Sequence, residues 1–283
     1  MTALFDFNYH LPRVEPGLDL QHPARAEALQ AAIDQEYHLL DHDWQALLAQ
    51  AGEQSRQRCQ AGAHLMVLDS RFAQNDSCLN WLQRHRQNPT TLLVDFRADD
   101  IRTQLANIAD AGARGIKFHP YLQAITSADH EAVQACASHA QALGLWISVD
   151  CSYGTLALYR CSGPELLAAL LPTINKVPVF ALHFGGPRIL DVMMLALAAP
   201  NLYLDTSLSL SFWKGSTVDQ DLAFAIGRLG AERFLFGTDQ PFIAFEQAVN
   251  DMASFMDRFK LNEAQCRWLW RDSALSLMSR YGQ

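Results

Sequence analysis

The first residues suited to chemistry lie in Leu4–Pro12, Leu-Phe-Asp-Phe-Asn-Tyr-His-Leu-Pro. This stretch is typical of a short apolar strand that ends in polar side chains. Because successive side chains of a strand alternate between its faces, we expect Asp6, Asn8 and His10 on one face, opposite the three aromatic residues. Ligands two residues apart on one face can converge on a single ion or substrate atom. The alternative is a structural strand whose Asn8 and His10 are only hydrogen-bonded.

Polar side chains also follow most of the later apolar stretches. In a barrel of parallel strands, the carboxyl ends of all strands meet at the same mouth. A purely structural barrel has no need of titratable groups there, because each one loses hydration unless it is paired. The clustering therefore predicts a functional site built from many strands. Its candidates beyond the first strand are Asp69, Asp95, Arg97, Lys117, His119, Asp150, His183, Asp205 and Asp239.

Two of these residues are the strongest candidates for proton transfer. Asp239 follows Gly-Thr at the end of an apolar stretch, and its carboxylate is expected to act as general base to a water or to hold a metal. His183 precedes Gly185-Gly186, which allow a close approach of backbone and substrate, and it is expected to act as acid, base or ligand. The structural alternatives are a helix-capping carboxylate and a hydrogen-bonded core histidine.

Lys117 and His119 share one face of another predicted strand. Inside a barrel mouth, Lys117 can bind a carboxylate or polarise a carbonyl, or it can form a structural ion pair with Asp95 or Asp150. Asp150 itself is a candidate metal ligand, base or ion-pair partner.

Other residues are candidates for substrate binding or for purely structural roles. Arg97 can bind an anionic group bidentately, while Tyr153 and Trp213, in the loops after the fifth and seventh strands, are candidate pocket residues. Asp205 and Asp69 are interpreted as strand-end helix caps. The remaining histidines are interpreted as surface or capping residues: His22, His38, His42, His64, His85, His130 and His139.

A regular alternation of strands and helices positions these side chains. Short runs rich in Val, Ile, Leu and Phe alternate with helices, which predicts parallel strands with helical crossovers. Eight such units predict an α/β fold, a (β/α)8 TIM barrel in a single domain, 1–283, with an extended excursion at about 12–60 and closing helices at about 245–280. An open doubly wound sheet is the alternative, but no glycine-rich phosphate loop follows the first strand.

The composition narrows the class of protein. Of 283 residues, 49% are hydrophobic and the net charge is −8, so a large core is expected and nucleic acid is not. No apolar run approaches the roughly 20 residues that span a bilayer, and we see no signal peptide. Six separated cysteines without a Cys-x-x-Cys pair predict reduced thiols in a cytoplasmic protein. A homo-oligomer is possible.

Several motifs resemble the metal-dependent amidohydrolase superfamily, in particular the subgroup related to amidohydrolase-type decarboxylases and lactonases. They are Gly115-Ile-Lys-Phe-His-Pro, Leu182-His-Phe-Gly-Gly-Pro, Phe236-Gly-Thr-Asp-Gln-Pro-Phe and the Asp-x-x-x-His-x-Pro remnant at 6–12. The resemblance covers nearly the whole chain, down to a closing helix at Trp268–Ala274.

Two positions depart from the pattern of that family. Its first strand normally carries His-x-His, where this chain has Asn8 before His10, and its fifth strand normally ends in a metal-binding histidine, where this chain has Asp150. By resemblance the metal ligands are Asn8, His10, Asp150 and Asp239, with His183 close by. Such an oxygen-rich set implies one divalent ion, Zn or Mn. A metal-free site is the alternative, since some lactonases of the superfamily are thought to work without a metal.

The expected function is a hydrolase that adds water to a C–O or C–N bond of a small, carboxylated molecule. Asp239 activates the water, His183 shuttles a proton, and Lys117 and His119 stabilise the developing oxyanion, with a metal if one is bound. One alternative is a metal-dependent non-oxidative decarboxylase of the same fold. Another, motivated by Asn8 and Asp150, is a degenerate barrel that acts as a binding or scaffold protein.

Overall fold

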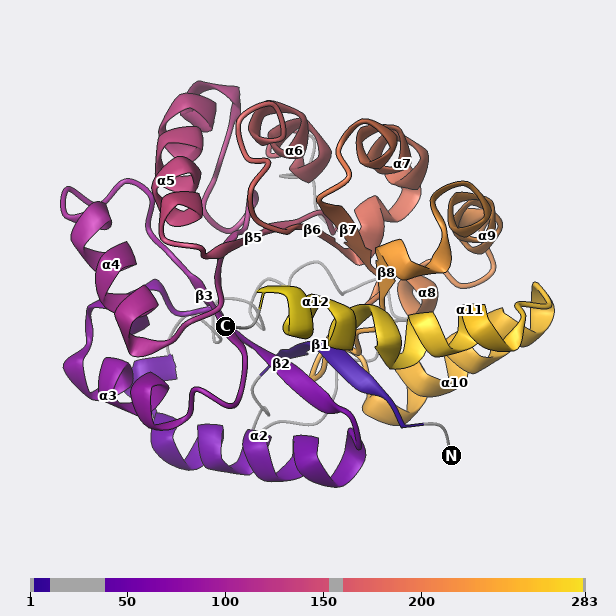
Figure 1. Ribbon diagram of the computed structural model, residues 1–283, viewed down its shortest axis with the longest axis horizontal. Coiled ribbons are helices and arrows are strands. Elements are labelled where there is room, and N and C mark those ends of the chain that lie inside the picture. Colours follow the sequence, from indigo (N-terminus) through magenta and orange to yellow (C-terminus); the bar gives the residue numbers. More distant parts are fainter. Residues whose placement is uncertain (1–2, 11–38, 153–159, 282–283) are drawn as a thin grey trace, which may run out of the picture.

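A computed structural model describes residues 3–10, 39–152 and 160–281. Its sheet has eight parallel strands in the order β1 to β8 (Figure 1). Backbone hydrogen bonds join the last strand to the first, including Phe7 N to Phe236 O (2.8 Å) and Asp239 N to Asn8 O (3.0 Å). The strands are β1 (Phe5–His10), β2 (Gly62–Val67), β3 (Thr90–Leu93), β4 (Gly115–Phe118), β5 (Trp146–Asp150), β6 (Val179–Leu182), β7 (Leu202–Asp205) and β8 (Phe234–Leu235). The predicted (β/α)8 barrel is confirmed.

Helices surround the sheet and connect its strands (Figure 1). They are α2 (Trp44–Arg58), α3 (Asp76–Arg84), α4 (Ile101–Ala111), α5 (His130–Ala142), α6 (Gly163–Leu170), α7 (Ile189–Ala198), α8 (Ser209–Phe212), α9 (Val218–Leu229), α10 (Phe245–Arg258), α11 (Glu263–Arg267) and α12 (Ser273–Tyr281). Residues 12–38 of the predicted excursion lie outside the described residues. Within the closing helices predicted for about 245–280, a π-helical segment, η7 (Trp268–Asp272), separates α11 from α12, and α8 was not predicted.

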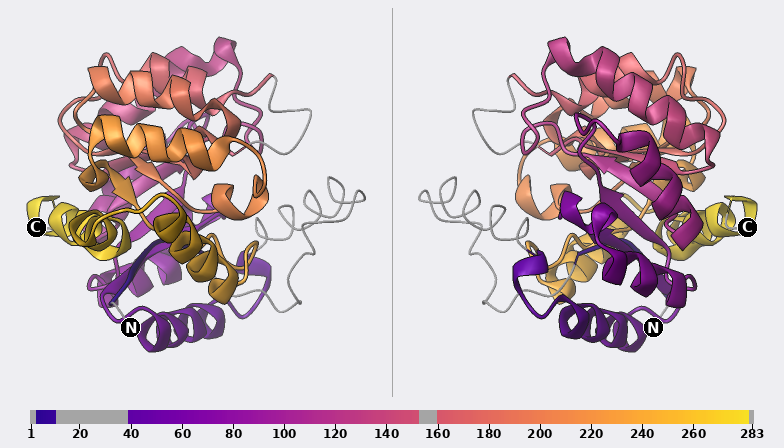
Figure 2. Two further views of the ribbon diagram at one scale, coloured as in Figure 1. Left: turned by 90° about the vertical axis from the view of Figure 1, so that its right-hand side faces the viewer. Right: turned by 90° about the vertical axis from the view of Figure 1, so that its left-hand side faces the viewer.

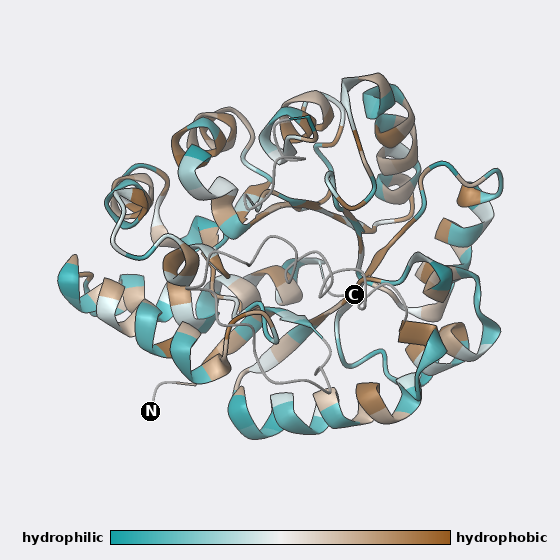
Figure 3. Ribbon diagram, turned by 180° about the vertical axis from the view of Figure 1, so that it is seen from behind, coloured by the Kyte–Doolittle hydropathy of each residue, from teal (hydrophilic) through white to brown (hydrophobic). Residues whose placement is uncertain are grey.

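The strands separate two hydrophobic clusters. The larger cluster lies between sheet and helices and takes one face of each strand, for example Ile147 and Val149 of β5. The smaller cluster fills the barrel interior with side chains such as Phe7, Trp146 and Phe180. Figure 3 shows mainly hydrophobic strands inside a ring of helices that carry both hydrophilic and hydrophobic residues. Since both faces of every strand are covered, most strand residues are apolar, which is why the strands were recognisable in the sequence.

Helix α12 covers one end of the barrel. It packs against β1 and β8 and contributes Ala274 and Leu277 to the interior cluster. Figure 2 shows α12 and α8 at opposite ends of the barrel. Because α8 follows the carboxyl end of β7, the mouth that carries the polar residues is at the end opposite α12.

A bulge in β1 changes the direction of its side chains. In the pairing with β2, Phe7 and Asn8 together face the single residue His64. As a result Phe7 packs inside the barrel, whereas Tyr9 belongs to the outer cluster. The prediction that the aromatic residues of this stretch share one face is therefore wrong at Tyr9. Alternation of polarity does not reveal an extra residue in a strand.

Asp6 does not join Asn8 and His10 at the mouth, contrary to the prediction. Its buried carboxylate accepts hydrogen bonds from the backbone N–H (2.9 Å) and the hydroxyl (2.6 Å) of Thr238, and from Asn8 N (3.2 Å). Burial raises the pKa of Asp6 to about 6, although these hydrogen bonds oppose the shift. Asp6 thus fastens the segment after β8 to β1.

His64 is a core residue, not the surface or capping residue that we predicted. Its ring is fully buried in the barrel, edge-on to Phe7 and Trp146, and its Nε2 lies 2.9 Å from the Thr91 hydroxyl. Burial lowers the pKa of His64 to about 3, so the folded protein holds this imidazole neutral.

Two further expectations concern thiols and membranes. All six cysteines are free, and all but Cys266 are buried, which confirms the prediction of reduced core thiols. Within the described ranges, no helix combines the length and apolarity needed to cross a membrane.

Protonation of His64 should weaken the fold in acid. Because its folded pKa lies below its unfolded value, the stabilisation is complete above about pH 6.5 and is lost as the pH falls toward 3. Between pH 7 and 4, wild type should lose about 2–3 kcal/mol more unfolding free energy than His64→Gln, which keeps a polar partner for Thr91 without titrating. Urea unfolding at both pH values measures this, with the exposed His42→Gln as control. Equal losses in wild type and His64→Gln would contradict the prediction.

Candidate active site

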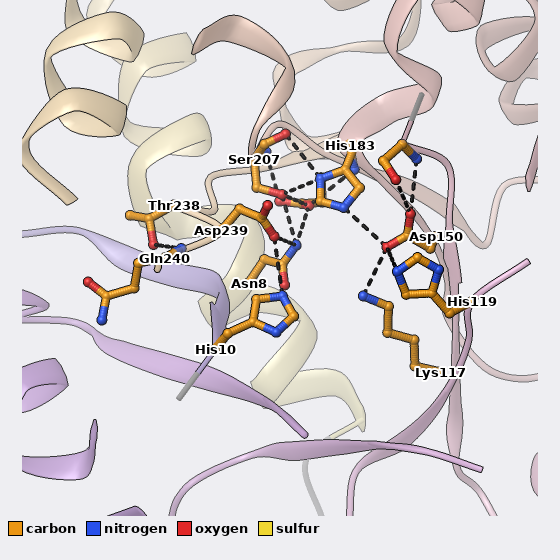
Figure 4. Close-up of polar contacts among 12 residues, drawn as sticks. Asn8, His10, Lys117, His119, Asp150, His183, Ser207, Thr238, Asp239 and Gln240 are labelled. Atoms are coloured by element: carbon orange, nitrogen blue, oxygen red, sulfur yellow. Dashed lines mark hydrogen bonds and ion pairs between the residues drawn. The ribbon is translucent and has the colours of Figure 1, made fainter. Parts of the chain in front are cut away.

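The carboxylate of Asp150 is the centre of the first of two polar clusters at the mouth (Figure 4). Its Oδ2 lies 3.0 Å from Lys117 Nζ and 3.2 Å from the Nε2 atoms of both His119 and His183. Its Oδ1 accepts hydrogen bonds from the backbone N–H and the hydroxyl of Ser152. All of these side chains are buried. Residues from β4, β5 and β6 thus meet on one carboxylate, as their strand-end positions predicted.

This arrangement fixes the charges of the cluster. Burial alone would raise the pKa of Asp150, but His119, Lys117 and His183 hold it well below its usual range. Burial lowers the pKa of His119 to about 3, against the opposing effect of Asp150, so His119 is neutral. For His183 the opposite balance holds: the Asp150 and Asp239 carboxylates outweigh burial and raise its pKa to about 9. At neutral pH the cluster contains ionised Asp150 and protonated His183.

Asp239 is the centre of the second cluster. Its Oδ1 lies 3.2 Å from His10 Nε2 and 3.3 Å from Asn8 Nδ2. Burial would raise the pKa of Asp239, but the positive charges around it, His183 first, lower it. The carboxylate is therefore ionised at neutral pH.

Asp205 and Ser207 link the two clusters. Asp205 Oδ2 accepts hydrogen bonds from Asn8 Nδ2 (3.1 Å), from the backbone N–H of His183 (3.3 Å) and from the Ser207 hydroxyl. The Ser207 hydroxyl also lies 3.0 Å from His183 Nδ1 and 2.8 Å from Asn8 Nδ2. Asp205 had been interpreted as a helix cap, and Ser207 was not singled out. Their i, i+2 spacing at a strand end is the same as that of Asn8 and His10, and would have identified them.

The backbone after β6 and β8 is in an unusual conformation where the site needs it. His183 (φ 61°) and Asp239 (φ 60°) both have positive φ, which is uncommon for residues other than glycine and occurs mainly where surrounding structure enforces it. Gly237, two residues before Asp239, is packed closely against its neighbours. A Cβ added to this glycine would lie 2.5 Å from Asp205 Oδ1 and 2.8 Å from Asn8 Cβ. A side chain at this position would push β8 away from the second cluster.

The predicted metal ligands do not form one metal site. Asp150 lies in the first cluster with Lys117, whereas Asn8, His10 and Asp239 lie in the second. Over the described residues, no group of three or more His, Cys, Asp or Glu side chains is placed to hold a metal ion. The donor set implied by the resemblance therefore does not fit a metal.

Other predicted site residues lie away from both clusters. Arg97 is exposed, pairs with Asp129 (2.8 Å) and stacks on Phe96, so it holds neighbouring loops together. Trp213 packs edge-on against Phe212 and lines a surface pocket of about 100 Å³ between α8, α9 and α10.

Asp69 and Tyr153 are two further residues for which the sequence predicted a role. Asp69 caps the short helix η2 (Ser70–Gln74) by accepting from Arg71 N, as predicted. Tyr153 lies outside the described residues.

Buried carboxylates, histidines and a lysine at the carboxyl ends of barrel strands define an enzyme-type site. The family model of the amidohydrolases matches residues 41–277 of the sequence. The chain belongs to the amidohydrolase family.

Several solved structures are similar over nearly their whole length. A protein from Pseudomonas putida described as a "putative 2-pyrone-4,6-dicarboxylic acid hydrolase" has 17% identity and a TM-score of 0.64, covering 99% of this chain and 98% of that one. An amidohydrolase from Burkholderia multivorans with bound Zn has 15% identity and a TM-score of 0.63 over 98% and 99%. A 2,6-dihydroxybenzoate decarboxylase from Rhizobium has 13% identity and a TM-score of 0.57 over 99% of both chains. Similarity at these identities establishes the fold. Among curated proteins there was no significant match.

The Lys117–Asp150 ion pair should behave as a coupled unit. Removing one partner leaves a buried, uncompensated charge, so Lys117→Met and Asp150→Asn should each lower the unfolding free energy by about 3–5 kcal/mol. The double variant should lose less than the sum, with a coupling of about 1–3 kcal/mol. Urea unfolding of the four proteins measures this cycle.

The exposed pair of Lys260 and Asp257 provides the control, because breaking it should change stability by no more than about 1 kcal/mol. Additive losses in the Lys117 and Asp150 cycle would mean that the two side chains are not energetically coupled.

Proposed function

We propose that the chain is a hydrolase that adds water to a C–O bond of a lactone or ester, or to a C–N bond of an amide, in a small anionic molecule. The observation that carries this proposal is the position of Asp239. Among the described residues, His10 and Asn8 both contact Oδ1, which leaves Oδ2 to accept a proton from water. Similarity to the 2-pyrone-4,6-dicarboxylic acid hydrolase makes carboxylated cyclic esters the first candidates for the substrate.

The charge of each residue in the site determines its role in the proposed reaction. With its lowered pKa, Asp239 is a weak base, so it takes a proton efficiently only when water attacks a strongly polarised carbonyl. Lys117 supplies that polarisation, since a buried ammonium in a water-poor site stabilises a developing oxyanion. Protonated His183 then donates a proton to the leaving oxygen or nitrogen, for which its Nε2–H exchanges Asp150 for the leaving atom. Neutral His119 orients Asp150 through its Nε2.

A non-oxidative decarboxylase is the second candidate, because a decarboxylase shares this fold. The two reactions differ in their products. In water enriched in oxygen-18, hydrolysis incorporates one labelled oxygen into the product acid, whereas decarboxylation releases carbon dioxide from the substrate. A panel of carboxylated lactones, esters and amides, together with 2,6-dihydroxybenzoate, separates the two reactions.

Asp239→Asn should abolish most of the turnover and leave the fold intact. Loss of the general base should lower kcat/KM by about 100- to 10,000-fold on the best substrate of the panel. Steady-state kinetics and circular dichroism measure the two properties. Asp257→Asn, an exposed carboxylate on α10, is the matched control and should keep wild-type kinetics. Retention of turnover in Asp239→Asn would refute the assignment, and a folded wild type inactive on the whole panel would favour the binding or scaffold alternative.

A further inference from the structure

We propose that this chain has replaced the metal ion typical of its family with an internal cation: the Lys117 ammonium, held by Asp150, is the group that contacts the reacting carbonyl oxygen. This inference rests on the proposed hydrolase function and names the electrophile of that site. Four observations carry it: the engagement of Asp150, the orientation of the two histidines, the orientation of Asn8 and the unused donors of Lys117.

The carboxylate of Asp150 has no free electron pair to offer a metal. Its two oxygens lie within 3.2 Å of five potential donor groups, those of Lys117, His119 and His183 at Oδ2 and two of Ser152 at Oδ1. A carboxylate presents about four lone-pair sites. A divalent ion bound to Asp150 would have to displace these donors and would stand beside the ammonium of Lys117, whose charge repels it.

The two histidines of this cluster are also turned away from metal binding. Both direct Nε2 at an oxygen of Asp150, and a nitrogen that donates its N–H to that carboxylate does not offer a metal its lone pair. In His183 the other nitrogen, Nδ1, faces the hydroxyl and the carbonyl oxygen of Ser207.

In the second cluster, the side-chain nitrogen of Asn8 points at the oxygen atoms of its neighbours. Its Nδ2 lies within 3.3 Å of oxygens of Asp205, Ser207 and Asp239, which are acceptors for an amide N–H. The nitrogen of an amide is a donor and not a metal ligand. At the position where the family places its first histidine, this chain therefore presents an N–H to Asp239, while Asn8 Oδ1 is buried without a hydrogen-bond partner among the described residues.

Lys117 has N–H donors left with which to bind a carbonyl oxygen. Its side chain is buried on β4, and among the described residues its ammonium has one partner, Asp150. An ammonium carries three N–H donors, so two remain for a ligand. The ammonium is also close enough to Asp239 to help hold that carboxylate ionised. A carbonyl oxygen at Lys117 thus lies in the same mouth as the water held by Asp239.

The first test is metal binding, which needs no substrate. Wild type purified without chelator should contain less than about 0.1 equivalent of zinc, manganese or iron, and its Tm should shift by less than about 1 °C in excess ZnCl2 or MnCl2. Near one equivalent of metal, lost in Asp239→Ala, would overturn the inference and leave the proposed hydrolase standing. Absence of turnover together with absence of metal would instead refute the proposed hydrolase.

The second test is chemical rescue on the best substrate of the panel. Lys117→Ala should lower kcat by about 100- to 1,000-fold with a smaller change in KM. Propylammonium should restore kcat saturably by at least about 10-fold, whereas NaCl at equal ionic strength should not. The exposed Lys176→Met should match wild type. Failure of rescue in folded Lys117→Ala would show that Lys117 is only structural. If Lys117→Ala does not fold, chelator-sensitive wild-type activity restored by ZnCl2 overturns the inference, and activity insensitive to chelator supports it.

Discussion

The site depends on the burial of the Asp150 carboxylate. An ionised carboxylate in a barrel interior would be strongly destabilising if it were alone, because it has lost its hydration. Lys117, His119 and His183 replace that hydration on one oxygen, and Ser152 replaces it on the other. In return, the charge of Asp150 keeps His183 protonated. The protonation state of the proposed acid is therefore set by a carboxylate that itself takes no part in bond making.

The barrel is shaped to bring these charges together. The bulge in β1 sends Asn8 to the mouth directly after Phe7 has packed into the interior. The positive φ of His183 turns the chain at the end of β6, and the backbone N–H of this residue donates to Asp205. Such conformations are unfavourable in isolation and persist because the surrounding contacts enforce them. They are found here at the two residues proposed to move protons, His183 and Asp239.

The fold was predictable from sequence because its signals are local. Strands covered on both faces are continuously apolar, and glycine marks helix ends such as Gly112, where φ is 100°. The strand-end rule also placed Lys117, His119, Asp150 and His183 together. It failed for Arg97, because a residue beyond the end of β3 can turn toward a neighbouring loop and pair with Asp129. The alternation of strand faces, from which Asp6 was predicted to lie with Asn8 and His10, failed because a bulge interrupts it, and no polarity pattern records a bulge.

The two departures from the family pattern are each matched by a partner in the structure. Asp150 stands where the family has a histidine, and the added negative charge is balanced by Lys117 on the neighbouring strand. Asn8 stands where the family has another histidine, and its neutral N–H groups lie between Asp205 and Asp239. A carboxylate at position 8 would add a third negative charge there. The raised pKa of Asp205 shows that burial already disfavours its ionised form. Reverting Asp150 to histidine alone would leave the Lys117 ammonium uncompensated. Reverting Asn8 to histidine would exchange the two N–H donors of the amide for the single N–H of a neutral imidazole between Asp205 and Asp239.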